Sequence, residues 1–117
     1  MFERYSFVAV TTANLDSARV FWSQGMGCAI TEDKPGEFFM ADVGGLRLCV
    51  DRADGTAHKS PGSDPIIGLK VKSVRDALLT FSRRGITIER GPVNTERGAY
   101  AELRDPDGRL IVVTEMD

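Results

Sequence analysis

Few residues of the sequence have side chains suited to nucleophilic or metal chemistry. It contains one histidine, His58, and two cysteines, Cys28 and Cys49. A Ser-His-Asp or Cys-His mechanism needs the imidazole beside the nucleophile, and no pattern brings His58 near either cysteine. We therefore interpret His58 as a solvated loop residue and Cys49 as a small buried hydrophobe rather than a nucleophile. Two cysteines are also too few for a four-thiolate zinc site.

Two glycine-containing segments begin like ligand loops but lack the rest of the motif. Residues 105–108 read Asp-Pro-Asp-Gly, the start of a calcium loop, yet no glutamate follows at the required spacing. A turn between two strands explains them fully. Gly25-Met26-Gly27 follows a predicted helix rather than a strand, so it is not a phosphate loop. We assign no catalytic residue, no metal ligand and no cofactor.

The composition is that of one ordinary soluble domain. The 117 residues carry 15 Lys and Arg against 17 Asp and Glu, a formal net charge of −2, and 42% of them are hydrophobic. The basic residues are scattered, whereas nucleic acid binding needs a concentrated basic face. No apolar run approaches the ~18 residues of a membrane span. The first residues also lack the pattern of a secretion signal, so we expect a cytoplasmic protein with reduced thiols, bound to neither nucleic acid nor membrane.

An internal repeat predicts the elements that must position any site. Residues 6–26 and 65–85 match at a shift of 59, each an apolar β-rich run followed by a helix. Asn14 and Ser73 are suitable N-cap residues for these helices. Gly25 or Gly27 is expected to end the first helix, and Gly85 the second.

The second part of each repeat predicts a hairpin. Residues 38–43 and 46–50 flank two glycines, and residues 99–104 and 109–114 flank the Asp-Pro-Asp-Gly turn. A further strand is expected after each helix, at 28–31 and 86–89. The chain is thus predicted to be a single α+β domain of two βαβββ modules, residues 1–53 and 64–117, joined by a polar linker, residues 54–63.

These features resemble the vicinal-oxygen-chelate superfamily, which includes glyoxalase I, extradiol dioxygenases and the fosfomycin- and bleomycin-resistance proteins. The resemblance rests on residues 7–10 through 14–22, on residues 104–110 and on the repeated βαβββ order. It implies a cupped mixed β-sheet with the helices on its outer face, and a ligand site inside the cup.

Enzymes of this superfamily hold a divalent metal through side chains on the first and last strands of each module. Carried over to this sequence, the first-strand positions are Phe7 and Ile66. The last-strand positions are Cys49, or a neighbour of it, and Val112. Three of these four residues have no donor atom, so we expect no metal here. The resemblance is thus closest to the metal-free bleomycin-resistance proteins.

The expected ligand site is the cup itself, an apolar floor with a few polar groups around it. Residues that share strand parity with the four metal positions should line it, and the family's last hairpin adds Tyr100 and Glu102. Either Phe38 or Phe39 would close its mouth. The predicted ligand-binding residues are Phe7, Phe38, Arg47, Cys49, Ile66, Lys70, Tyr100, Glu102 and Val112. Alternatively, the floor is filled by its own side chains, and Arg47, Lys70 and Glu102 only form ion pairs at the surface.

The sequence therefore favours a protein that binds a small apolar or aromatic molecule, such as an antibiotic, without changing it. The resemblance also implies a homodimer with ligand grooves between the subunits. One alternative is an enzyme of the same fold (a lyase, isomerase, dioxygenase or thiol transferase), in which Glu102 acts as a base beside Tyr100. Another is a regulatory or interaction module with a vestigial pocket.

Overall fold

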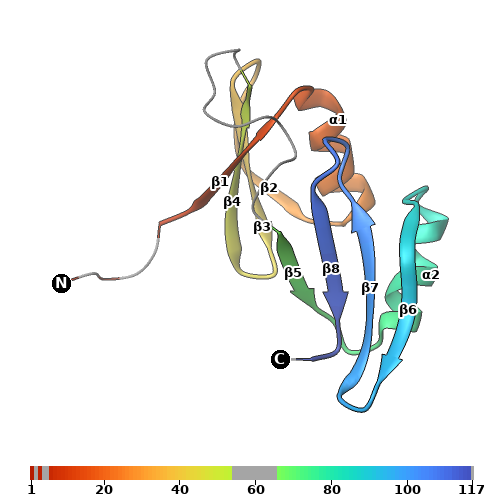
Figure 1. Cartoon of the computed structure of the whole chain (residues 1–117). Helices are drawn as coiled ribbons and strands as arrows, with labels where there is room; N and C mark the ends of the chain where they lie inside the picture. The colour runs from red at the N-terminus through yellow and green to blue at the C-terminus, as the bar shows by residue number, and fades with distance from the viewer. Residues whose placement is uncertain (2, 4–5, 54–65, 117) are drawn as a thin grey trace.

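The computed structural model describes residues 1, 3, 6–53 and 66–116. Two modules lie side by side and repeat the order βαβββ (Figure 1). The first comprises β1 (Val8–Thr12), α1 (Leu15–Val20), the π-helix η1 (Phe21–Gly25), β2 (Ala29–Lys34), β3 (Phe38–Val43) and β4 (Leu46–Arg52). The second comprises β5 (Ile67–Lys70), α2 (Val74–Arg83), β6 (Ile88–Thr95), β7 (Gly98–Arg104) and β8 (Leu110–Thr114). The predicted α+β class and tandem modules are confirmed, while the predicted linker, 54–63, with His58 lies outside the described residues.

Each module forms one mixed four-stranded sheet, and the two sheets have equivalent topologies. Their strand orders are β1-β4-β3-β2 and β5-β8-β7-β6, with the first and last strands of a module parallel. Ala9 pairs with Cys49 in one sheet, and Gly68 pairs with Val112 in the other. Cys49 and Val112 thus occupy equivalent points of the two sheets, as the repeat predicts.

Both helices begin at the predicted caps. The Asn14 Oδ1 accepts a hydrogen bond from the Ser17 N–H at 3.0 Å, and the Ser73 Oγ accepts one from the Asp76 N–H at 3.1 Å. The second helix ends before Gly85, whose φ of 82° is a left-handed conformation that favours glycine. The first helix differs from the prediction because it widens into η1, where the Met26 N–H bonds to the Phe21 carbonyl five residues earlier.

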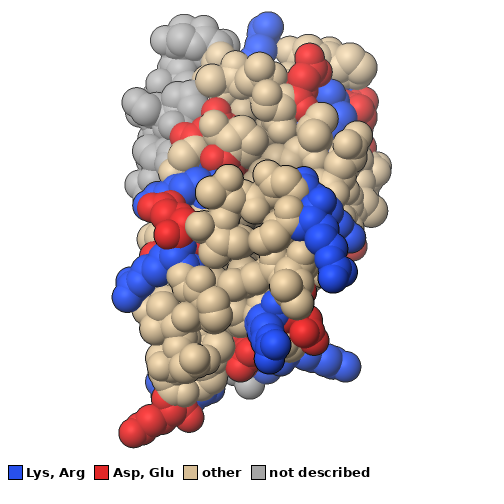
Figure 2. Space-filling view, turned by 90° about the vertical axis from the view of Figure 1, so that its right-hand side faces the viewer, with Lys and Arg blue, Asp and Glu red and all other residues tan. Residues whose placement is uncertain are grey.

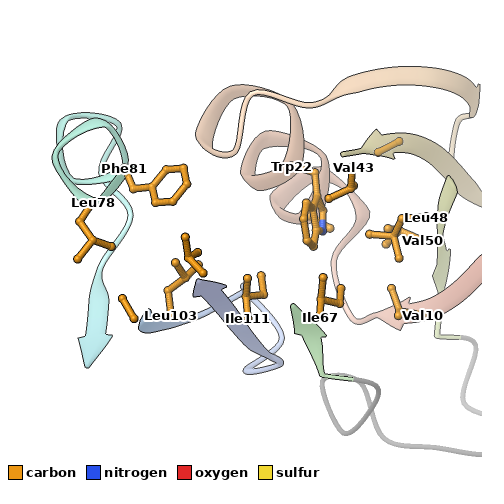
Figure 3. Packing of buried hydrophobic residues seen from close by; sticks show 14 of the residues in the cluster. Val10, Trp22, Val43, Leu48, Val50, Ile67, Leu78, Phe81, Leu103 and Ile111 are labelled. Carbon is orange, nitrogen blue, oxygen red and sulfur yellow. The ribbon is translucent and has the colours of Figure 1, made fainter. Parts of the chain in front are cut away.

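One hydrophobic core joins the helices to both sheets (Figure 3). Trp22 and Phe81 point from the helical segments towards Ile67 and Ile111 on the strands below. Trp22 is completely buried, so its indole packs the helical segment against the sheet. Because both modules contribute to this core, each holds the other in place.

Strand β6 is longer than predicted. The strand expected at 86–89 runs from Ile88 to Thr95 and passes through Gly91-Pro92, residues that usually end a strand. Its ladder with β7 shifts register on both sides of Arg90, and these irregularities accommodate the Gly-Pro pair. β6 is also an edge strand, where a proline removes no ladder hydrogen bond.

The turn between β7 and β8 fastens the second module to the first. Arg109 forms a buried ion pair with Asp105, and its Nη2 donates to the Thr11 carbonyl at 2.6 Å. The Asp107 Oδ1 accepts a hydrogen bond from the Ala13 N–H at 2.8 Å. We call these three interactions the clasp. The two hydrogen bonds satisfy backbone groups at the end of β1 and hold it against the second module, and the ion pair fixes the Arg109 side chain.

The surface carries both signs of charge. On the face shown in Figure 2, side chains of both signs lie around a broad area of uncharged residues. No helix in the described part of the chain combines the length and hydrophobicity needed to span a membrane.

Candidate functional site

Each sheet has one face against the helices and one opposite them, which we call the helix-free face. Side chains alternate along a strand. Val10 and Val50 belong to the core, so Ala9 and Cys49, one position away, lie on the helix-free face. Met40, which pairs with Cys49, lies there too. Met40 and Cys49 are 6% and 8% exposed yet lie outside the core cluster, in agreement with this parity.

The first sheet brings four predicted site residues to this face or its edge. Arg47 and Cys49 lie on β4, and Phe7 immediately precedes β1 and is 53% exposed. Phe38 pairs with Asp51, which shares the parity of Cys49, so Phe38 also lies on the helix-free face. Phe39 is completely buried in the core, which resolves the choice between the two phenylalanines.

The second sheet brings together the other five. One ladder row contains Gly68, Val112 and Glu102, and the next contains Lys70, Thr114 and Tyr100. Ile66 precedes β5 and is 62% exposed. The helix-free face of this sheet thus has an apolar centre at Val112 with polar groups on both sides, and contact of these residues with a ligand stays a prediction.

Arg90 belongs to this group but was missed from the sequence. It pairs with Glu102 across β6 and β7, and its guanidinium carbon lies 5.7 Å from the centroid of the Tyr100 ring, a cation–π arrangement. The predicted strand ended at residue 89, one residue before Arg90. The signal that could have found it is the apolar Val93 beyond Gly91-Pro92, which extends the strand pattern.

Arg47 has a polar setting near the start of β4. Its Nη1 donates to the Ser6 carbonyl at 3.1 Å, and Asp42 lies opposite it on β3. The side chain is exposed, so its guanidinium is accessible to an acceptor group of a ligand.

The four positions that hold metal in related enzymes do not fit a divalent cation. Phe7, Ile66 and Val112 have no donor atoms. Burial raises the pKa of the Cys49 thiol to about 11, and the neighbouring carboxylate of Asp51, which accepts its hydrogen bond, adds to the shift. A neutral thiol is a poor ligand because metals bind the thiolate. Among the described residues, no group of three or more His, Cys, Asp or Glu side chains is arranged so that it could hold a metal ion.

The predicted residues lie on open sheet faces, whereas a more enclosed space lies between the modules. This crevice of about 470 Å³ is lined by apolar residues of both modules, among them Met26, Leu46 and Phe81. Its wall includes Gly68 and Lys70 of β5 together with Leu69, which has the opposite parity, so the crevice runs along the edge of β5. Such a volume suits a small organic ligand.

Comparison with known proteins agrees with this architecture. A family model described as the Glyoxalase/Bleomycin resistance protein/Dioxygenase superfamily matches residues 4–113. A search of curated protein sequences finds no match.

Several solved structures share the fold. The antibiotic-binding protein TnmS3 from Streptomyces sp. CB03234 is 22% identical over 100% of both chains, with a TM-score of 0.81. UcmS2 is 17% identical over 98% of this chain and 99% of its own, with a TM-score of 0.80. Lactoylglutathione lyase from Agrobacterium tumefaciens is 16% identical over 96% of this chain and 92% of its own, with a TM-score of 0.75. Because an antibiotic-binding protein and an enzyme share this fold, function must be argued from the site.

Proposed function

Because the chain belongs to the glyoxalase/bleomycin resistance protein/dioxygenase superfamily, we propose that it binds a small apolar or aromatic molecule without a metal ion and without changing it. The observation that carries this proposal is the replacement of metal donors by Phe7, Ile66 and Val112 on otherwise intact βαβββ modules. Apolar side chains in these positions favour burial of a ligand's hydrocarbon surface, which contributes about 25 cal/mol per Å² before ordering losses.

Polar groups around the apolar centre would orient the ligand. Arg47 on one sheet, and Lys70, Glu102 and the Arg90–Tyr100 pair on the other, provide donors and acceptors. The full-length similarity to TnmS3, an antibiotic-binding protein, supports an antibiotic as the natural ligand. The protein would sequester this ligand in the cytoplasm. The cytoplasmic location is also supported by the two free cysteines, Cys28 and Cys49.

We further propose that the active form is a homodimer. β1 and β5 each lie at the edge of their sheet, and the large apolar side chains beside them, Phe7 and Ile66, are more than half exposed. Unpaired strand edges next to exposed apolar groups favour association with a second copy. Light scattering at tens of micromolar should give twice the 12.8 kDa mass of the chain, and a monomer mass would contradict the proposal.

Native mass spectrometry of protein purified from its native host tests the binding function directly. We expect a co-purified small molecule of unchanged mass at a stoichiometry of one per site. Titration with bleomycin and with the naphthalene dye 8-anilinonaphthalene-1-sulfonate should raise Tm, since a ligand that binds only the folded state stabilises it.

The same experiments distinguish the alternatives. A product formed from a bound compound would support an enzyme that uses Glu102 as a base. A ligand-free spectrum together with an unchanged Tm would contradict small-molecule binding and favour an interaction module.

A further inference from the structure

Gly68 is a glycine that the fold itself does not require. Eight other glycines of the described residues have positive φ, where a side chain is strained, but Gly68 does not. Gly25 also lacks a positive φ, but a Cβ there would lie 3.1 Å from the Ile86 Cδ1. At Gly68, apart from its chain neighbours, no atom lies within 4 Å of the position that a Cβ would take. Neither backbone conformation nor packing therefore explains this residue.

A glycine inside a strand weakens the strand, because it loses more conformational freedom than alanine and has no side chain to pack. β-Branched residues would stabilise the same position. Glycine in a strand otherwise marks a place where a ligand or another backbone approaches closely. The equivalent residue of the first module, Ala9, is also small and exposed.

The surroundings of Gly68 favour a ligand. It stands on the helix-free face between Ile66 and Lys70, with Val112 beside it and Glu102 one strand further in the same row. Gly68 and Lys70 also line the crevice of about 470 Å³, whereas Ile66, Val112 and Glu102 lie outside it. A strand rises about 3.3 Å per residue, so the side chains of Ile66 and Lys70 stand about 13 Å apart. We call the strip of the helix-free face between these two side chains the slot. It is long enough for a planar system of two or three fused rings.

We propose that Gly68 is the specificity-determining position of the ligand site, where a planar aromatic ring lies against the backbone of β5 beside Val112. The inference rests on the proposed binding function and specifies its ligand class. Lys70 and Glu102, at two sides of the slot, would meet polar substituents of that ring system. A side chain at position 68 would occupy the space of the ring without disturbing the fold.

The test is a volume series, Gly68→Ala, Gly68→Val and Gly68→Leu, with 8-anilinonaphthalene-1-sulfonate as the probe. We expect the Kd from fluorescence titration to rise in the order of side-chain size, at least tenfold for Gly68→Val. The Tm of Gly68→Ala and Gly68→Val should equal or exceed that of the wild type. The matched control is Ala29→Val, an exposed strand position at the far edge of the other sheet, which should leave the Kd unchanged.

Three results would overturn the inference. A wild type that binds the dye together with a Gly68→Val variant of equal Kd would remove the role of Gly68 and leave the binding function intact. Loss of the dimer in Gly68→Val, seen by light scattering, would show that a second copy fills the slot. Unfolding of Gly68→Ala would show that the space is needed by the fold. A wild type that binds neither the dye nor any other aromatic compound overturns the proposed function itself.

Discussion

Among single residues, Arg47 offers a way to separate ligand binding from folding. Its side chain is exposed and bonds to the Ser6 carbonyl at 3.1 Å. We expect Arg47→Ala to weaken binding of 8-anilinonaphthalene-1-sulfonate by about 1.5–3 kcal/mol, because hydrogen bonds to charged groups contribute about that much. The free energy of unfolding should change by less than about 1 kcal/mol, since the side chain is exposed.

The matched control is Arg52→Ala, on the same strand but at a position of opposite parity. Calorimetric titration and urea unfolding of both variants decide the outcome. Equal binding by Arg47→Ala and wild type, or unfolding of Arg47→Ala, would mean that the arginine is structural.

Val112 tests the apolar centre of the second sheet. The sequence places it on the apolar floor of the cup, and the structure shows a partly buried side chain that pairs with Glu102. Val112→Glu would place two carboxylates opposite each other across neighbouring strands and should destabilise the fold by about 1–2 kcal/mol. Urea unfolding at pH 7 measures this loss, and Val112→Gln, which lacks the charge, should recover part of it. An unchanged stability would contradict the assigned register.

The reactivity of the two cysteine thiols should depend on pH. Burial raises the pKa of Cys28, with a contribution from Asp42, and raises that of Cys49 to about 11. A raised thiol pKa keeps the unreactive protonated form at neutral pH, so about one Cys49 thiol in a thousand is ionised at pH 8. The alkylation rate of Cys49 by iodoacetamide should rise about tenfold per pH unit between pH 7 and 10. A plateau near pH 9, as for denatured protein, would contradict the burial.

At the scale of elements, the turn between β7 and β8 has a stabilising role that its sequence alone did not reveal. Asp105 and Arg109 form a buried ion pair, and removal of one partner leaves the other charge buried and unpaired. Arg109→Ala should therefore lower the free energy of unfolding by about 3–5 kcal/mol. The control is Arg104→Ala, whose ion pair with Glu89 is exposed to solvent, so this variant should lose much less stability than Arg109→Ala. Equal losses in the two variants, measured by urea unfolding, would contradict the clasp.

The elements that could be predicted are those with strong local signals. Asn14 and Ser73 marked the helix starts because their side chains bond to backbone groups three residues ahead. The π-helix η1 after Val20 has no such signal, because packing decides it. Past Gly91-Pro92, the sequence marks the continuation of β6 only by the apolar Val93, a weaker signal than a helix cap. The pairing of Arg109 with Thr11 depends on how the modules meet, which local spacing does not encode.

At the scale of the whole molecule, three of the four family positions lack donor atoms and the fourth, Cys49, carries a protonated thiol, which predicts a protein that needs no metal. After dialysis against Zn²⁺, Ni²⁺, Mn²⁺ or Fe²⁺, elemental analysis should find well below one ion per chain. Neither EDTA nor added metal should change Tm or dye binding. A stoichiometric, chelator-sensitive ion would contradict the alignment of Phe7, Cys49, Ile66 and Val112 with the ligand positions and would favour an enzyme.

The candidate site was predictable as far as strand alternation reaches. The internal repeat aligns Cys49 with Val112, and strand alternation places both side chains on the helix-free faces of their sheets. It could not choose between Phe38 and Phe39, because two adjacent aromatic residues fit either face. It also could not find the Arg90–Tyr100 contact or the crevice, since both depend on three-dimensional packing.

The clasp has a further consequence, for the lifetime of the folded state. Its hydrogen bonds join residues 94 and 98 positions apart, whereas the hairpins of each module form from neighbouring segments. Contacts that close such long loops form late, after local structure has nucleated folding. In stopped-flow experiments, Arg109→Ala should accelerate unfolding and leave the refolding rate almost unchanged. The clasp would then slow unfolding and so set the lifetime of the folded molecule, without changing how quickly the chain folds.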